Sequence, residues 1–584
     1  MERFKLTPHR SRILIALMVI LGAVFVVRLF YLQVVMHGYY ESEADKEHTS
    51  KFTIAAKRGL IYAHDGTSGY APLVLNEPVY TVFADPRYVK NPDQVADAMR
   101  KIAGGNILNN FEDGLRDKTK EYVVLARNVS EDQANLIKQQ KLSGQGIGLQ
   151  QESKRVYPED QLAAQVLGFV NGEGQGQYGI EEGMNAQLAG KDGQLKAVTD
   201  VHGIPISVGS QSVQTPAQDG KNVVLTIDRN VQNKAEQALA AGLKNAKATK
   251  GSVVVMDPNN GHILAMANAP TYNPNDFSKV TDYSVFQNRA ISDPYEPGSV
   301  IKALTMGVGL NENRIQPNTT YNNVGYVKVD DAIIKNVETE PKGTVTMTQV
   351  LQYSFNTGVV WVLKQLGDGS DTITMAGKQM LYNYYTKHYL FGQPTGIELA
   401  GEVSGIVPQP TASNVQYANM TFGQGINISM LQVMGAFSAD INGGTYYTPQ
   451  VVDGYRDNTN NFTSKAGTIR ESNVINPTAS AKLRQMLHDA REGSPANAGE
   501  KAGYYIGGKT GTAQVYNPKL GQYDPVATIG SYLGFGGQDK PQYVIMVRVD
   551  DATVGGFAGT SAAAPIFTDI SNWMLDYLQI APKG

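Results

Sequence analysis

The hydrophobic pattern beyond about residue 220 predicts an antiparallel sheet with helices packed on it. Short apolar runs at 223–227 and 543–550 are typical of strands, and residues 251–268 predict two strands joined by Asp-Pro-Asn-Asn-Gly. Apolar residues recur at helical spacing over 229–246 and again over 566–577. The order of these elements indicates an α+β domain in which the last helix lies across the sheet.

The longest apolar run lies near the N-terminus and predicts a transmembrane helix. Uncharged residues extend from Ile13 to Val27, and Arg28 can extend its head group to the interface, so the span continues to Val35. A cleaved signal peptide is the alternative, although no Ala-x-Ala-like site follows the run. Basic residues precede the span and the acidic sequence ESEADKEHTS follows it. The positive-inside rule therefore predicts a single-pass protein of the cytoplasmic membrane whose large C-terminal part is extracytoplasmic.

Between the span and the predicted sheet, residues 49–215 are polar and predict a separate domain of strands and loops. Gly174, Gly176 and Gly179 match G-x-G-x-x-G, which binds dinucleotides only between a strand and a helix of a parallel sheet, so we expect a flexible loop here. Residues 208–222 have the composition of a linker. The expected boundaries are 1–12 for a cytoplasmic tail, 13–35 for the transmembrane helix, 36–220 for the N-terminal domain with its linker, and 221–584 for the C-terminal domain.

Composition excludes several kinds of chemistry. A chain of 584 residues predicts more than one folded unit, and a net charge of −3 argues against nucleic acid as the main partner. The chain has no cysteine, so disulfides, thiol nucleophiles and cysteine-ligated metals are all excluded. Its eight histidines are scattered without the spacing of a metal site. We therefore expect neither a metal nor another cofactor.

A candidate nucleophile lies in the sequence YEPGSVIKALTM. Ser299 and Lys302 form Ser-x-x-Lys at a predicted helix start, where positions i and i+3 share one face. A serine hydroxyl becomes nucleophilic only when a neighbouring base takes its proton. Because a free lysine has a pKa of about 10.4, a base role for Lys302 requires a shift of about 3 units. The apolar neighbours, the helix N-terminus and a second cation would all lower the pKa of Lys302.

Two further motifs follow in the order known for serine acyltransferases of this type. Ser354 and Asn356 form Ser-x-Asn, and Lys509, Thr510 and Gly511 form Lys-Thr-Gly. Each motif alone also fits a cap, a turn or a strand bounded by glycine. Their ordered occurrence together with Ser-x-x-Lys is the stronger signal.

Each residue type suits a step of acyl transfer. Ser354 can relay a proton to a leaving amine, and the Asn356 amide can bind a peptide substrate. Lys509 can lie near the nucleophile and a substrate carboxylate, which the Thr510 hydroxyl can also bind, while Gly511 lets the substrate backbone approach the strand. The backbone N–H groups of Ser299 and Thr512 form the expected oxyanion hole.

The chain resembles the class B penicillin-binding proteins, which are membrane-anchored peptidoglycan D,D-transpeptidases. Besides the three motifs, the resemblance includes the sequences RLFYLQV, KRVYPEDQLAAQVLGFVN, GIEEGMNAQLAGKDG, VVLTIDRNVQNKAEQAL, TGIELAGE and TFGQGINISMLQVMGAFSADINGG, all in family order.

The resemblance implies an elongated, mixed N-terminal pedestal of the dimerisation type. It also implies a C-terminal penicilloyl-serine-transferase domain with an antiparallel sheet and a helical subdomain. In such enzymes the serine is acylated by the penultimate D-Ala of a stem pentapeptide, and the amine of a neighbouring strand then takes the acyl group. Ser299 would take this role and would also be acylated by β-lactams.

One segment of the N-terminal domain departs from the family pattern. The usual Arg-Gly-x-Ile-x-Asp-Arg-x-Gly is RGLIYAHDG here, with Ala63 and His64 at the Asp-Arg pair. This puts the usual contact of the pedestal in doubt and leaves the catalytic motifs unchanged. Ser-Phe-Asn, with Phe355, is a tolerable variant of the middle motif.

Two other functions remain as alternatives. A serine β-lactamase or β-lactam sensor would share the acylation chemistry, but a β-lactamase also needs a base to activate water, for which Glu398 is a candidate. A catalytically silent scaffold of wall synthesis is the second alternative. The presence of Ser299, Lys302 and Lys509 argues against it, because no structural role requires all three.

The resemblance also implies partners. Because no glycosyltransferase-like domain fits in the pedestal, we expect a SEDS-type glycosyltransferase to polymerise the glycan, together with other division proteins. The chain carries no repeats after the last predicted helix, and its pedestal is short for an elongation-type relative. These two observations favour the septal, division-type branch over the elongation type.

Overall fold

The structure is a computed structural model that describes residues 8–66, 69–140, 146–198, 213–337, 340–457, 459–517, 522–538, 540–553 and 558–582. The chain forms two compact units. One unit contains residues 1–57 and 190–220, and the other contains residues 58–189 and 221–584.

The first unit contains the apolar N-terminal helix that the sequence predicts. Helix α1 (Pro8–Phe30) continues through a π-helical turn, η1 (Tyr31–Val35), and α2 (His37–His48) follows. Among the described residues, His9–Val35 is the one helical segment long and apolar enough to cross a membrane. Strands β1 (Thr49–Ile54), β8 (Gly193–Val198) and β9 (Val213–Thr215) form an antiparallel sheet. The predicted linker 208–222 thus contains β9, while its residues 208–212 lie outside the described residues.

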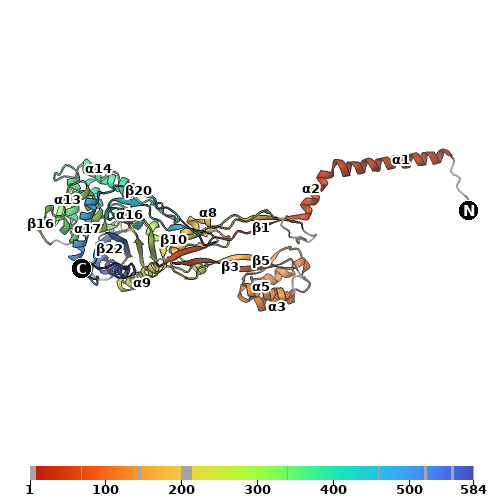
Figure 1. Cartoon of the computed structure of the whole chain (residues 1–584), viewed down its shortest axis with the longest axis horizontal. Helices are drawn as coiled ribbons and strands as arrows, with labels where there is room; N and C mark the ends of the chain where they lie inside the picture. Colours follow the sequence, from red (N-terminus) through yellow and green to blue (C-terminus); the bar gives the residue numbers. More distant parts are fainter. Residues whose placement is uncertain are drawn as a thin grey trace. The chain divides into compact units, whose positions relative to one another are not determined.

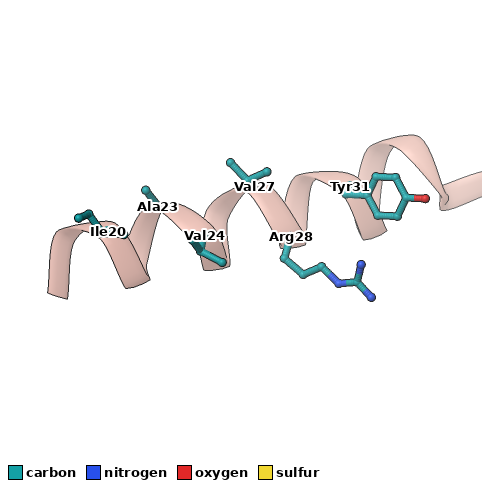
Figure 2. Close-up of a pocket in the computed structure, with 6 residues that line it drawn as sticks. All are labelled: Ile20, Ala23, Val24, Val27, Arg28 and Tyr31. Carbon is teal, nitrogen blue, oxygen red and sulfur yellow. The ribbon is translucent and has the colours of Figure 1, made fainter. Parts of the chain in front are cut away.

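A shallow hollow on α1 contains the one charged residue of the expected span. Figure 2 shows the residues that line it: Ile20, Ala23, Val24, Val27, Arg28 and Tyr31. The Arg28 side chain extends away from the helix axis, and its Cζ lies 5.7 Å from the centre of the Tyr31 ring. Arginine and tyrosine are both favoured at the membrane interface, so this pair suits the end of a span.

In the second unit, the N-terminal part is built on a mixed sheet of seven described strands in the order β19-β18-β10-β2-β3-β4, with β5 also paired to β3. These are β2 (Ile61–Asp65), β3 (Gly69–Ala84), β4 (Val123–Val129), β5 (Ile147–Val156), β10 (Asn222–Asp228), β18 (Val452–Arg456) and β19 (Phe462–Ser464). Helices α3 (Pro92–Ala103), α4 (Phe111–Arg116) and α5 (Glu131–Gln139) share an apolar core with β3, β4 and β5. Figure 1 shows α3 and α5 beside β5.

A buried ion cluster holds the start of this sheet together. Glu181 is fully buried and accepts hydrogen bonds from Nε of Arg58 at 2.7 Å and Nε of Arg155 at 2.7 Å. At the position where the family pattern has arginine, Nε2 of His64 lies 2.9 Å from Oδ2 of Asp453 on β18. The altered sequence therefore still joins β2 to a strand from the C-terminal part of the chain.

The G-x-G-x-x-G segment is an ordered turn, so the expectation of a flexible loop is wrong. Helix α6 (Ala164–Leu167) leads into a hairpin of β6 (Phe169–Val170) and β7 (Gly176–Gln177), which is followed by α7 (Gly179–Gly183) and α8 (Asn185–Leu188). A Cβ at Gly176 would lie 1.8 Å from the carbonyl oxygen of Glu181. The glycine is needed because the chain packs closely here, and no parallel sheet precedes the helix as a dinucleotide site requires.

The C-terminal part confirms the predicted antiparallel sheet. Its five described strands have the order β12-β11-β23-β22-β21. Their bounds are β11 (Lys250–Met256), β12 (Ile263–Ala269), β21 (Tyr505–Asn517), β22 (Gln522–Gly537) and β23 (Pro541–Asp550). Helices α9 (Arg229–Ala246) and α18 (Ala564–Tyr577) share an apolar core with one face of the sheet. The predicted strand, helix and hairpin over 223–268 are also confirmed.

The other face of the sheet supports a helical subdomain. Its helices are α10 (Arg289–Ser292), α11 (Ile301–Asn311), α12 (Met347–Gln352), α13 (Asn356–Leu366), α14 (Met375–Asn383), α15 (Asn414–Met420), α16 (Met430–Ile441) and α17 (Pro477–Glu492). Its short strand pairs are β13 (Thr320–Asn323) with β16 (Gly343–Thr346), β14 (Tyr326–Val329) with β15 (Ala332–Lys335), and β17 (Thr445–Tyr447) with β20 (Ile469–Ser472). Figure 1 shows α16 and α17 on one side of β22 and α9 on the other. The α+β class is therefore confirmed.

Candidate active site

The candidate nucleophile lies on a short turn that is packed against the sheet. Ser299 is half-buried in a 3-10 turn, Gly298–Val300, which leads directly into α11. Gly298 has a φ of +67° and donates its N–H to the carbonyl of Gly423 at 3.1 Å. A Cβ at Gly298 would lie 3.0 Å from the carbonyl oxygen of Thr512. Only glycine suits both this backbone conformation and this close contact with β21.

Lys302 is fully buried because α11 is apolar on all sides. Every residue from Ile301 to Leu310 is buried, as expected of a helix at the centre of a domain. The Lys302 Nζ donates to the Ser354 carbonyl oxygen at 2.5 Å and to the Ser354 Oγ at 3.0 Å. Among the described residues, no hydrogen bond joins Lys302 to the Ser299 hydroxyl. The structure thus connects the first two motifs through Ser354.

The environment of Lys302 lowers its proton affinity. Burial lowers the pKa of Lys302 well below its ordinary value, and the nearby charge of Lys509 lowers it further. The Phe422 ring centre lies 6.0 Å from the same amine and adds apolar surface. A neutral amine that hydrogen-bonds to a second hydroxyl is suited to accept and pass on a proton.

Ser354 has an uncommon backbone conformation for a residue with a side chain. Its φ is +56°, and it lies in the short connection between α12 and α13. Such left-handed residues are uncommon, and they cluster at functional sites when the surrounding structure holds them there. In this conformation both the carbonyl oxygen and the hydroxyl of Ser354 reach the Lys302 amine.

Lys509 lies on β21, the edge strand of the sheet. It is opposite Leu533, which is opposite Met546, so its row of the sheet is largely apolar. Lys509 is 3% exposed, and burial lowers its pKa from 10.5 to about 7. Its Nζ donates to the carbonyl oxygen and the Oγ1 of Thr510, both at 3.2 Å. Lys509 and Thr510 are thus placed together, as the proposed binding of a carboxylate requires.

Gly511 and Thr512 continue β21 past the nucleophile turn. A Cβ at Gly511 would lie 3.0 Å from the carbonyl oxygen of Pro297 and 2.3 Å from the Ser531 Oγ. The Thr512 Oγ1 accepts the N–H of Gly559 at 3.3 Å. The backbones of Ser299 and Thr512, which carry the predicted oxyanion donors, are therefore on adjacent segments.

Asn356 is the first residue of α13 and is half-buried. Its Nδ2 donates to the carbonyl oxygen of Lys335 on β15 at 2.8 Å. The following residue, Thr357, donates its N–H to the Asn336 Oδ1 at 2.9 Å. The middle motif therefore also fixes the β14–β15 hairpin beside the site.

Several residues to which the sequence assigned no role also hold the nucleophile turn in place. The Glu296 carboxylate accepts the N–H of Gly425 at 2.7 Å, and the backbones of Tyr295 and Ile428 exchange two hydrogen bonds. Gly423, Gly425 and Ile428 all lie in the sequence TFGQGINIS, which forms part of the family resemblance. Its glycine spacing was the available signal, but spacing does not reveal which segment lies opposite.

Glu398 is placed in a structural ion pair. Its carboxylate pairs with Lys465 and accepts the N–H of Val451 at 2.9 Å. Neither partner contacts the residues of the three motifs in the described structure, so Glu398 is unsuited to activate water at Ser299. Within the described ranges, no group of three or more His, Asp or Glu side chains could hold a metal ion.

Comparisons with known proteins agree with this geometry. Residues 251–572 match the family described as "Penicillin binding protein transpeptidase domain", and residues 53–225 match "Penicillin-binding Protein dimerisation domain". Stage V sporulation protein D of Bacillus subtilis is 32% identical over 98% of this chain and 87% of its own length. Peptidoglycan D,D-transpeptidase FtsI of Escherichia coli is 30% identical over 98% of this chain and 91% of its own length.

A solved structure also matches. The crystal structure of penicillin-binding protein 2X from Streptococcus thermophilus covers 91% of this chain and 80% of its own chain, with a TM-score of 0.73 and 25% identity. Both domains and the fold are therefore accounted for by one family. The chain belongs to the class B penicillin-binding proteins.

Proposed function

We propose that this protein is a serine-type peptidoglycan D,D-transpeptidase that cross-links stem peptides. The observation that carries the proposal is the buried Lys302, whose amine has a lowered pKa and is hydrogen-bonded to Ser354 next to the Ser299 turn. A neutral amine at this position can act as a base at neutral pH, as an ordinary lysine cannot.

In the first half of the reaction, the Ser299 Oγ attacks the carbonyl carbon of the penultimate D-Ala. Lys302 takes the hydroxyl proton, and the backbone N–H groups of Ser299 and Thr512 stabilise the oxyanion. The peptide bond then breaks, the terminal D-Ala leaves, and Ser354 passes a proton to its amine. Lys509 and Thr510 bind the terminal carboxylate, while the Asn356 amide and the β21 backbone at Gly511 align the peptide.

In the second half, the amine of a neighbouring stem peptide attacks the ester on Ser299. The new peptide bond forms, the Ser299 hydroxyl is regenerated, and the amine proton returns through Ser354 and Lys302. The ring of a β-lactam would be opened by the same attack. The leaving amine would stay attached to the acyl group, so the drug would remain on Ser299 as an ester.

The Ser299 assignment is tested by intact-mass analysis after incubation of the full-length protein with a β-lactam. We expect one covalent adduct in the wild type and none in Ser299→Ala. Rapid turnover of the drug without an accumulated adduct would instead support a β-lactamase.

The cellular role is part of the proposal. Peptidoglycan D,D-transpeptidase FtsI of Escherichia coli and stage V sporulation protein D of Bacillus subtilis are both similar over nearly the whole chain, and the short pedestal favours septal synthesis. Partners would be a SEDS-type glycosyltransferase and other division proteins, reached through residues 13–35 and the pedestal at 36–220. Residues 1–12 would be cytoplasmic, and the transpeptidase domain at 221–584 would lie outside the cytoplasmic membrane.

Depletion in the source cell tests the cellular role. Filaments with blocked septa would support the septal assignment, whereas round cells that still divide would assign the protein to elongation.

A further inference from the structure

A row of polar residues crosses the five-stranded sheet directly under the nucleophile segment. Strand registers place Asn268 opposite Ser252, Ser252 opposite Arg548, Arg548 opposite Ser531, and Ser531 opposite Gly511. Directly opposed residues share one face of an antiparallel sheet, so the row extends from β12 to β21 on the face toward Ser299. Asn268, Ser252, Arg548 and Ser531 are all buried.

This row differs from the next row of the same face on the side that ends at Lys509; on its other side, Asp550 lies opposite Lys250 and Ile529. The neighbouring row contains Val254, Met546 and Leu533, which are apolar, before it ends at Lys509. A buried polar residue is costly unless it has hydrogen-bond partners, so a polar row in an apolar sheet face requires partners above it.

For Ser531 and Arg548, those partners are in the segment that leads into Ser299. The Ser531 Oγ donates to the carbonyl oxygen of Pro297 at 3.3 Å. Arg548 Nη1 donates to the carbonyl oxygen of Asp293 at 3.0 Å, and its Cζ lies 4.2 Å from the centre of the Tyr295 ring. The sheet therefore contacts three alternate positions of the segment immediately before the nucleophile.

Carboxylates on both sides hold the Arg548 side chain. Its Nε donates to the Asp550 Oδ1 at 2.7 Å, and its Nη2 lies 3.1 Å from the Asp293 Oδ2. Arg289 on α10 pairs with the same two carboxylates. The Arg548 side chain is 5% exposed and its guanidinium is planar, so the group cannot move without breaking several contacts at once.

We propose that Arg548 is a positioning residue for the acylation step. It fixes the backbone of Asp293 and the ring of Tyr295, and through them the place of the Ser299 Oγ relative to Lys302 and the Thr512 N–H. It touches neither the substrate nor the reacting atoms. This inference rests on the proposed function, because it concerns how the acylated serine is held.

The expected consequence is a loss of rate rather than of binding. The surfaces that bind a β-lactam carboxylate, Lys509 and Thr510, do not contact Arg548 in the described structure. A displacement of about 1 Å at a nucleophile can cost about 100-fold in rate. Arg548→Lys keeps the positive charge but loses the planar stack on Tyr295 and the paired contacts with Asp293.

The test measures acylation of the full-length protein by a fluorescent penicillin over a range of drug concentrations, which separates the acylation rate constant from the drug dissociation constant. For Arg548→Lys we expect the rate constant to fall about 10-fold or more, with the dissociation constant changed less than about twofold. Ser531→Ala, which removes one hydrogen bond and no charge, should lower the same rate constant by a smaller factor.

Arg491→Lys is the matched control. Arg491 is also buried, pairs with Glu500, and stacks 5.0 Å from the ring of Tyr532, which belongs to the core on the opposite face of the sheet. We expect this variant to lower the melting temperature without lowering the acylation rate constant.

The outcomes separate the two levels of the proposal. Absence of a wild-type adduct would overturn the proposed function itself. If the wild type is acylated at Ser299 and Arg548→Lys has an unchanged rate constant, the role of Arg548 alone would be overturned. An equal loss of rate in Arg491→Lys would also overturn it, since the effect would then reflect general destabilisation. If Arg548→Lys does not fold, an unchanged rate constant in Ser531→Ala overturns the role of the row.

Discussion

Lys509→Met should make the folded protein more stable at pH 6 while it weakens acylation. The substitution keeps the length of the side chain and removes an amine that is 3% exposed. Burial lowers the pKa of Lys509 from 10.5 to about 7, so this amine destabilises the folded state when it is protonated in an apolar row.

The size of the effect follows from the two pKa values. A shift from 10.5 to about 7, at about 1.36 kcal/mol per unit, disfavours the folded state by about 5 kcal/mol at pH 6. Near pH 10 most of the folded molecules and a growing share of the unfolded chains carry a neutral amine, and the penalty falls to about 1 kcal/mol. The unfolded chain binds more protons between these pH values, so wild-type stability should rise with pH over this interval.

Methionine removes this penalty but also loses two long hydrogen bonds to Thr510, worth about 1 kcal/mol each. We therefore expect the variant to be about 3 kcal/mol more stable than the wild type at pH 6 and about 1 kcal/mol less stable at pH 10. Its acylation by a β-lactam should be slower and weaker at pH 6, because the drug carboxylate loses its ammonium partner, and the difference from the wild type should narrow toward pH 10, where the wild-type amine is neutral.

Urea denaturation followed by tryptophan fluorescence measures this difference. The chain has two tryptophans, Trp361 on α13 and Trp573 on α18, and both lie in the C-terminal part. Thr510→Val serves as the control, since it removes a partner of the amine without removing the amine. A difference between wild type and Lys509→Met that did not change with pH would refute the reasoning, even if the variant were more stable.

Three further predictions concern other buried ionisable side chains. Lys302→Met should lower the acylation rate by about 10²- to 10⁴-fold with an unfolding midpoint no lower than that of the wild type, and a wild-type rate would exclude Lys302 as the base. Burial raises the pKa of Asp440, while its hydrogen bond with the Tyr389 hydroxyl opposes the shift, so wild-type stability should be lost as pH rises from about 4 through the raised folded pKa. Asp440→Asn should lack this loss when urea midpoints are compared at pH 5 and pH 8, and parallel curves would contradict the assignment. Glu181→Gln should cost about 3–5 kcal/mol by urea denaturation, because it leaves two buried guanidinium groups without a carboxylate, and a cost below about 1 kcal/mol would show that those groups find other partners.

Local patterns were sufficient for several elements of the C-terminal domain. The helix at 229–246 and the strands at 251–268 lie where apolar spacing places them, because each buries one continuous face. The three motifs were also visible, since acyl transfer needs a hydroxyl, a base and a cation in a fixed order along this fold. The structure brings Lys302 and Ser354 together, which sequence order alone could only suggest.

Contacts between segments that are distant in the sequence could not be predicted from local sequence patterns. Helical spacing predicts that the Lys302 amine contacts the Ser299 hydroxyl. The amine instead forms a hydrogen bond with Ser354, and no sequence pattern predicts the left-handed backbone of Ser354. The glycines at 174, 176 and 179 resemble a flexible loop until Gly176 is seen packed on Glu181. Arg548 lies in an apolar strand where a lone arginine gives no sign of its partner, because strand register decides what lies above it.

The close packing around the nucleophile turn limits how this protein could evolve resistance to β-lactams. A Cβ at Gly423 would lie 2.2 Å from the carbonyl oxygen of Gly298, and a Cβ at Gly559 would lie 2.3 Å from that of Gly511. Real Cβ atoms do not approach backbone oxygens so closely, so a side chain at Gly423 would displace the nucleophile turn, and one at Gly559 would displace β21 at Gly511, for drug and substrate alike. Selection under antibiotic would therefore find its permitted substitutions at exposed positions away from this turn, such as Tyr326 and Ile333 on the β14–β15 hairpin, which are 56% and 58% exposed.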